Sequence, residues 1–199
     1  MGQKYKLTIA NQSTMTGNFC VFQDIPDVNC PGVLTLAWLV KRSHPGTTVD
    51  FEWSVDYDFV WSEQGSLLKG TKFQASQVVT GADLLNYNQI SFDYDGAYHF
   101  SNLTRGPRTG SLYVMEGPDV PNAQAHVGVG MSGKGTFVVP AQPNIELYFT
   151  PHPKYYVVFG NYTQGEVIDI TEMTKIANVQ FDSTHFEVPL KLNERNLWE

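Results

Sequence analysis

Residues 49–61 alternate between apolar and polar side chains almost without interruption. The odd-numbered positions are Val, Phe, Trp, Val, Tyr, Phe and Trp, and four even-numbered positions are the acids Asp50, Glu52, Asp56 and Asp58. Successive side chains of a β-strand point to opposite faces, whereas a helix would scatter these groups around its axis. The pattern therefore predicts one strand with an apolar face against a core and an acidic face opposite.

Shorter segments of the same kind recur along the chain, separated by turns that contain Gly or Pro, such as Asp95-Gly96. The continuous apolar run 33–40 predicts a strand that is covered on both faces. Helical spacing is confined to residues 82–86 and 169–177, the latter with Thr171 as a candidate cap. We predict an all-β fold, a two-sheet antiparallel β-sandwich of jelly-roll type, with one or two short helices.

Length, composition and charge limit the domain organisation and the partners. The 199 residues are 42% hydrophobic, which is ample for a packed core, and no linker, composition shift or repeat divides them. We therefore predict one domain over residues 1–199. A net charge of -7 disfavours a nucleic-acid partner, which would need a basic surface. The sequence contains no membrane span.

The beginning of the chain and the cysteines bear on the compartment. Residues 1–10 contain no apolar stretch long enough for a secretory signal, so we expect a protein that is cytoplasmic as synthesised. Export by a route that needs no signal would leave the same sequence. Cys20 and Cys30 are ten residues apart, and they are compatible either with one disulfide or with ordinary thiols in a reducing compartment.

The four acids of the alternating segment are the first candidate site. Alternate residues of a strand lie about 6.5 to 7 Å apart. Asp50 with Glu52, or Asp56 with Asp58, could therefore share a calcium ion or flank a glycosidic bond. Asp56 and Asp58 are the candidate metal ligands, with calcium as the possible ion, and no other cofactor is expected. Alternatively, the acids form a solvated sheet face that discourages edge-to-edge pairing.

Aromatic residues beside these acids would extend the site into a sugar-binding groove. Sugar rings stack on aromatic side chains, and carboxylates accept hydrogen bonds from sugar hydroxyls. The candidate residues are Trp38, Tyr94 and Tyr98, together with Asp93 and Asp95, which alternate with aromatic residues. We therefore expect a noncatalytic protein that acts by binding or self-association, with glycans as its external ligand in a lectin-like role.

Two other functions remain open. The first is a carbohydrate-active hydrolase that uses two of the four acids. The run from Asp50 to Ser54 is similar to the Glu-x-Asp-x-Glu strand of some jelly-roll glycosidases, although it lacks the final carboxylate. The second is a structural protein that assembles into homo-oligomers, whose mass in solution would exceed that of the 22.3 kDa chain.

No other motif in the sequence indicates a cofactor-binding, metal or catalytic site. Residues 128–135 match the G-x-G-x-x-G pattern of dinucleotide-binding loops, but an alternating apolar segment follows where a helix should. A hairpin or bulge is the expected structure of this segment. The five histidines have no metal-site spacing, and no G-x-S-x-G motif is present.

Several short sequence segments, spread over nearly the whole chain, resemble one protein family. The sequence is similar to the rhizosphere-expressed Rhi-type (RhiA-like) proteins of plant-associated bacteria at residues 4–9, 18–23, 36–39, 44–45, 130–133, 139–144, 149–153, 159–162 and 165–167. The resemblance implies a bacterial protein from a plant- or host-associated setting with quorum-regulated expression. It supplies no catalytic residues.

Overall fold

The computed structural model describes residues 3–199, which form eighteen strands and one short 3-10 helix. The strands of the first half are β1 (Lys4–Asn11), β2 (Gly17–Gln23), β3 (Asp27–Val28), β4 (Leu34–Leu36), β5 (Leu39–Ser43), β6 (Thr48–Ser54), β7 (Tyr57–Ser62), β8 (Gln77–Ala82) and β9 (Gln89–Tyr94). The others are β10 (Tyr98–Thr104), β11 (Leu112–Glu116), β12 (His126–Met131), β13 (Lys134–Pro140), β14 (Glu146–Thr150), β15 (Tyr155–Gly160), β16 (Val167–Ile168), β17 (Ala177–Val179) and β18 (Glu187–Leu192).

The strands form four hydrogen-bonded sheets, so the predicted all-β class is confirmed. Their strand orders are β18-β1-β6, β17-β15-β2-β5, β16-β4-β13-β12-β7-β8 and β10-β9-β11-β14-β3. Neighbouring strands are antiparallel except in the pairs β1 with β18 and β9 with β11. These parallel pairs and the division into four sheets were not anticipated.

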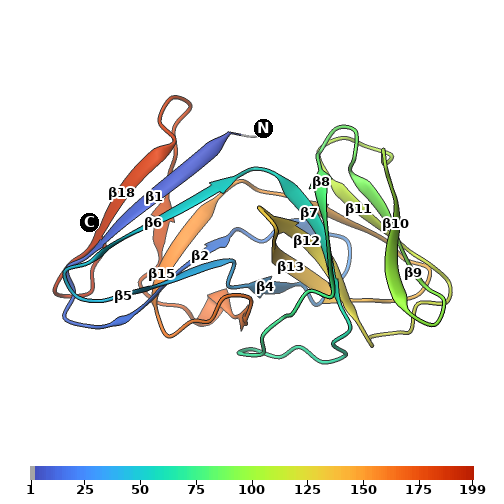
Figure 1. Ribbon diagram of the computed structural model, residues 1–199, viewed down its shortest axis with the longest axis horizontal. Coiled ribbons are helices and arrows are strands. Elements are labelled where there is room, and N and C mark those ends of the chain that lie inside the picture. Colours follow the sequence, from blue (N-terminus) through green and yellow to red (C-terminus); the bar gives the residue numbers. More distant parts are fainter. Residues whose placement is uncertain (1–2) are drawn as a thin grey trace.

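The four sheets lie as two face-to-face pairs (Figure 1), so the expected packing of two sheets occurs twice. In one pair, β1 faces β15 and the rings of Tyr5 and Tyr155 lie 6.0 Å apart. In the other, β7 faces β9 and the rings of Trp61 and Phe92 lie 5.8 Å apart. Buried residues of both pairs belong to one continuous hydrophobic cluster. Aromatic side chains from the facing sheets therefore fill the space inside both sandwiches.

Two segments that read as single strands are each divided between the pairs of sheets. The predicted strand 49–61 is β6 and β7 with a break at residues 55–56, and the predicted strand 33–40 is β4 and β5 with a break at 37–38. In each case the chain leaves one sheet and enters another, as Figure 1 shows for β6 and β7. The prediction of one continuous strand was wrong at both places, because polarity alternates in phase across the first break and the apolar run continues across the second.

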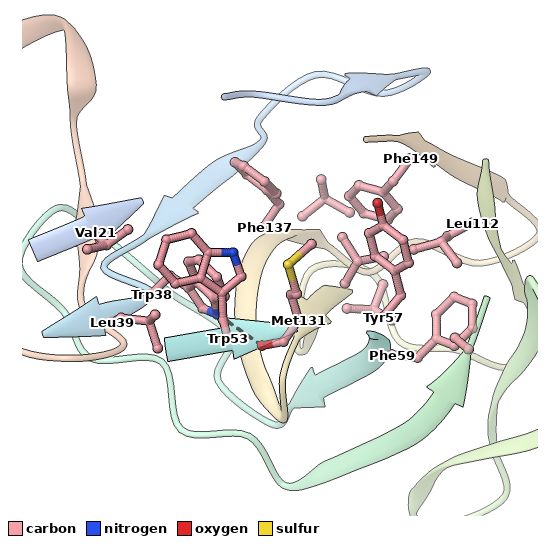
Figure 2. Packing of buried hydrophobic residues seen from close by; sticks show 14 of the residues in the cluster. Val21, Trp38, Leu39, Trp53, Tyr57, Phe59, Leu112, Met131, Phe137 and Phe149 are labelled. Carbon is pink, nitrogen blue, oxygen red and sulfur yellow. Dashed lines mark hydrogen bonds between the residues drawn. The ribbon is translucent and has the colours of Figure 1, made fainter. Parts of the chain in front are cut away.

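An aromatic cluster surrounds Trp38 in the hydrophobic core (Figure 2). The ring of Trp38 meets that of Trp53 edge-on at 5.5 Å and stacks against that of Tyr155 at 6.1 Å. Its indole N–H donates a hydrogen bond to the carbonyl oxygen of Met131 at 2.9 Å. This bond joins the break between β4 and β5 to the end of β12, so Trp38 links the two pairs of sheets.

The glycine-rich segment 128–135 forms the hairpin of β12 and β13, with a register shift between Val129 and Gly130. The predicted hairpin or bulge is therefore confirmed. A β-carbon at position 128 would lie 2.0 Å from the carbonyl oxygen of Phe137. Glycine is required here because the neighbouring backbone is too close for any side chain.

Helical structure is scarcer than expected. The only helix within residues 3–199 is the 3-10 turn Ile170–Glu172, which is capped by the side chain of Asp169 and not by Thr171. Residue 82 ends β8 and residues 84–87 form bends, so the prediction of a helix over 82–86 was wrong. None of the helical structure in this range is long and apolar enough to cross a membrane. The two cysteines, Cys20 and Cys30, are free thiols.

Candidate functional site

The break between β6 and β7 separates the four predicted acids. Asp50 and Glu52 are exposed on β6, beside Lys41 and Lys134 in a hollow of about 400 Å³. Asp50 accepts a hydrogen bond from the Thr8 hydroxyl at 2.7 Å, and its carboxylate lies 3.4 Å from the Lys6 ammonium. The Thr8 hydrogen bond, supported by Lys6, lowers the pKa of Asp50. This part of the acidic face is thus partly neutralised by its own lysines.

Asp56 and Asp58 lie near the β12–β13 turn, and they differ in environment. Asp56 is exposed and accepts a hydrogen bond from Ser54, whereas Asp58 is 2% exposed and accepts one from the Gly133 N–H at 2.6 Å. The expectation that Asp58 shares a solvated face was wrong, because its carboxylate holds the buried side of this turn. Within residues 3–199, no three His, Cys, Asp or Glu side chains are grouped to hold a metal ion. Calcium at Asp56 and Asp58 stays a prediction.

Burial of Asp58 makes stability depend on pH. Burial raises its pKa from 3.8 to about 6, the Asp56 charge adds to the rise, and the Gly133 hydrogen bond opposes it. The folded state therefore binds more protons than the unfolded state between those values. The stability contributed by this carboxyl is complete below pH 3.8 and is lost as pH rises through 6.

Asp58→Asn is therefore expected to raise the free energy of unfolding at pH 8 by on the order of 2 kcal/mol, and to change it less near pH 4. An amide oxygen still accepts from Gly133, but it carries no charge to desolvate. Urea unfolding at pH 4, 6 and 8 measures this difference, with Asp119→Asn as an exposed control. Parallel pH profiles of the wild type and Asp58→Asn would contradict the assignment.

The predicted aromatic groove does not assemble. Trp38 is 1% exposed and Tyr98 is 6% exposed, so neither presents a ring to a ligand. Tyr94 is half-buried, and its ring packs against that of Tyr98 at 4.8 Å. Asp93 lies on β9 and Asp95 directly follows it, so both are in the other pair of sheets from Asp50 and Glu52. The prediction that these residues line one groove was wrong, because the aromatic ones serve the core.

A different region carries a cavity of about 520 Å³ at the end of the sheet β17-β15-β2-β5. The cavity lies where β2 begins and β15 ends, and its lining includes Asn196 and Trp198, which follow β18. Its volume is in the range of small-molecule sites in proteins. We call it the C-terminal pocket, and its side chains fall into an aromatic, an amide and a cationic group.

Phe159 and Trp198 are the aromatic group of the C-terminal pocket. Both pack on the buried ring of Phe19, at 4.9 Å for Phe159 and 5.8 Å for Trp198. Gly17 leaves room for Phe159, because a β-carbon there would lie 2.7 Å from its ring. The indole N–H of Trp198 donates to the carbonyl oxygen of Lys175 at 2.6 Å. These core contacts and this hydrogen bond hold the rings of Phe159 and Trp198 in place, and we call the two rings the aromatic wall of the pocket.

Strand register places the polar groups of the C-terminal pocket. Asn18 of β2 pairs with Arg42 of β5 on one side and with Gly160 of β15 on the other. Asn18 also donates its amide N–H to the carbonyl oxygen of Tyr162 at 2.7 Å, which fixes its side chain. The lining also includes Asn161, Asn196 and Lys175. None of the described residues that line this pocket is acidic.

Sequence reasoning missed the C-terminal pocket entirely. Its residues come from positions 15–18, 42, 159–161, 174–175, 192, 196 and 198, with no motif among them. These positions come together because β2 pairs with both β5 and β15, so only the strand order could have revealed the pocket. That order cannot be read from local alternation, which contains no information on which strands are neighbours.

The fold and the C-terminal pocket define an all-β sandwich protein with a cavity of about 520 Å³ whose described lining contains no acidic residue. The chain belongs to the RhiA family, whose model matches residues 2–199. It is 34% identical over 201 aligned positions to Protein RhiA of Rhizobium leguminosarum bv. viciae, covering 100% of this chain and 86% of that protein. No solved structure matches the chain. The resemblance drawn from the sequence is confirmed.

Proposed function

We propose that this protein is a noncatalytic bacterial binding protein and that the C-terminal pocket binds a glycan. The observation that carries the proposal is the combination of the Trp198 and Phe159 rings with three amide side chains in one cavity of about 520 Å³. Sugar rings stack their C–H faces on aromatic side chains, and amides both donate to and accept from hydroxyl groups. We therefore place the binding site at the end of the sheet β17-β15-β2-β5, and not on the acidic strand predicted from the sequence.

The charges of the pocket favour binding over hydrolysis. Glycoside hydrolysis in most families uses two carboxyl groups about 5 to 9.5 Å apart on either side of the scissile bond. The described lining of the C-terminal pocket contains no Asp or Glu. Asp50 and Glu52 do line a hollow, but Asp50 is engaged by Thr8 and Lys6. A lectin-like role fits these surroundings better than the hydrolase alternative.

Removal of the aromatic wall tests the site. Trp198→Ala is expected to weaken binding on a glycan array by about tenfold or more, because one stacked aromatic ring contributes on the order of 1 to 2 kcal/mol. Tyr87→Ala is the matched control, since it truncates an exposed aromatic residue that does not line the pocket. Near-ultraviolet circular dichroism of both variants checks that the fold is retained.

The array is read with calcium and with chelator. We expect equal binding in both conditions, because the pocket offers no carboxylate to hold the ion. Calcium-dependent binding that survives Trp198→Ala would return the site to Asp56 and Asp58. A wild-type protein that binds no glycan in either condition would overturn the proposal, and a mass in solution well above 22.3 kDa would then favour assembly.

A further inference from the structure

The C-terminal pocket has the opposite charge from the rest of the chain. The protein carries 20 acidic and 13 basic residues, yet the charged side chains that line the pocket are Arg42 and Lys175. Positive charge inside a cavity of an acidic protein attracts and orients a negatively charged ligand. The charge of the ligand can therefore be inferred separately from its sugar ring.

Neither cation is neutralised within the protein. Lys6, Lys69, Lys154 and Lys191 each form an ion pair with a carboxylate, whereas Arg42 and Lys175 form none within residues 3–199. Arg42 is held by the pairing of β5 with β2, where it lies opposite Asn18. Lys175 has a left-handed backbone conformation, with a φ of 56°. Its carbonyl oxygen accepts the hydrogen bond from Trp198, so this position is fixed against the aromatic wall.

Asn196 supplies a second, independent observation. Its Oδ1 atom is buried and has no hydrogen-bond partner within the described chain. An unmet buried acceptor costs about 1 to 3 kcal/mol. Asn196 lines the same cavity, and its amide nitrogen lies 3.9 Å from the Met15 sulfur, a weak contact. The unmet acceptor therefore belongs to a residue that lines this cavity.

We infer that the C-terminal pocket takes an acidic sugar whose ring stacks on the aromatic wall and whose carboxylate is bound by Arg42 and Lys175. This inference rests on the proposed function and deepens it. The planar guanidinium of arginine matches a carboxylate in two parallel hydrogen bonds, and the lysine adds a point charge. Asn18 and Asn196 then serve the hydroxyl groups of the same ring.

The test compares two ligands that differ only in the carboxylate, methyl glucuronide and methyl glucoside, by isothermal titration calorimetry. The wild type is expected to bind the glucuronide about tenfold or more tightly, a difference of ~1.4 kcal/mol. Arg42→Gln and Lys175→Gln should each reduce this preference several-fold. Arg108→Gln is the matched control, since Arg108 is exposed and does not line the pocket. Higher salt should reduce the preference in the wild type.

The outcomes separate this inference from the proposed function. Equal binding of glucuronide and glucoside, with loss of both in Trp198→Ala, would overturn the acidic ligand and keep the glycan site. Binding of glucose 6-sulfate in preference to the glucuronide would overturn the carboxylate in favour of a sulfated sugar. A preference for the glucuronide that persists in the double variant of Arg42→Gln and Lys175→Gln would overturn the assignment of these two residues. Failure of every glycan on the array would overturn both proposals.

Discussion

Trp38→Ala is expected to lower the free energy of unfolding by about 3 to 5 kcal/mol. The substitution empties a site that is 1% exposed and that packs against the rings of Trp53 and Tyr155. It also removes the donor to the Met131 carbonyl oxygen, which then lies buried without that partner. A loss of this size is a large part of the 5 to 15 kcal/mol that stabilises a typical domain. Equilibrium unfolding in urea measures it.

The comparison with Trp38→Phe divides the effect between packing and hydrogen bonding. Phenylalanine keeps an aromatic ring in the cluster but donates no hydrogen bond to Met131, so we expect a loss of about 1 to 3 kcal/mol. A fully exposed aromatic residue would tolerate both changes. If Trp38→Ala unfolds at the urea concentration of the wild type, Trp38 does not lie in the core, and the sugar-binding role predicted from the sequence would stand again.

The strands were predictable because polarity alternates with the pleat, and the places where strands change sheets were not. Val55 and Asp56 continue the alternation of their neighbours, yet they lie in the gap between β6 and β7. Nothing in side-chain polarity marks this gap, because both sheets bury an apolar face toward one continuous cluster. Sheet membership depends on long-range pairing, here with β1 for β6 and with β12 for β7.

The candidate site was less predictable than the fold. Composition cannot distinguish an aromatic residue that lines a groove from one that fills a core, and Trp38 and Tyr98 are of the second kind. Asp58 is buried because a turn 75 positions away supplies its hydrogen bond, which no local pattern reveals. The C-terminal pocket joins Asn18 to Trp198, so it exists only once the strands are in order.

Gly128→Ala is expected to lower the free energy of unfolding by about 3 kcal/mol or more, the second large effect. Gly128 lies on β12 between Val60 of β7 and Val138 of β13. The added β-carbon would lie 2.0 Å from the Phe137 carbonyl oxygen and 2.7 Å from the Val138 Cα. Both are backbone atoms, so no side-chain rotation relieves the clash, and β12 and β13 must separate or shift.

Gly65→Ala is the control for Gly128→Ala, because a β-carbon at position 65 meets its nearest atom at 3.4 Å. We expect it to change the free energy of unfolding by less than about 1 kcal/mol. Equal stability of the two variants in urea would show that β12 and β13 do not approach as closely as described. The expected contrast also explains the G-x-G-x-x-G match. Gly128 and Gly130 are required by the neighbouring strand, and Gly133 has the positive φ of the hairpin turn. The pattern therefore follows from backbone packing and turn geometry.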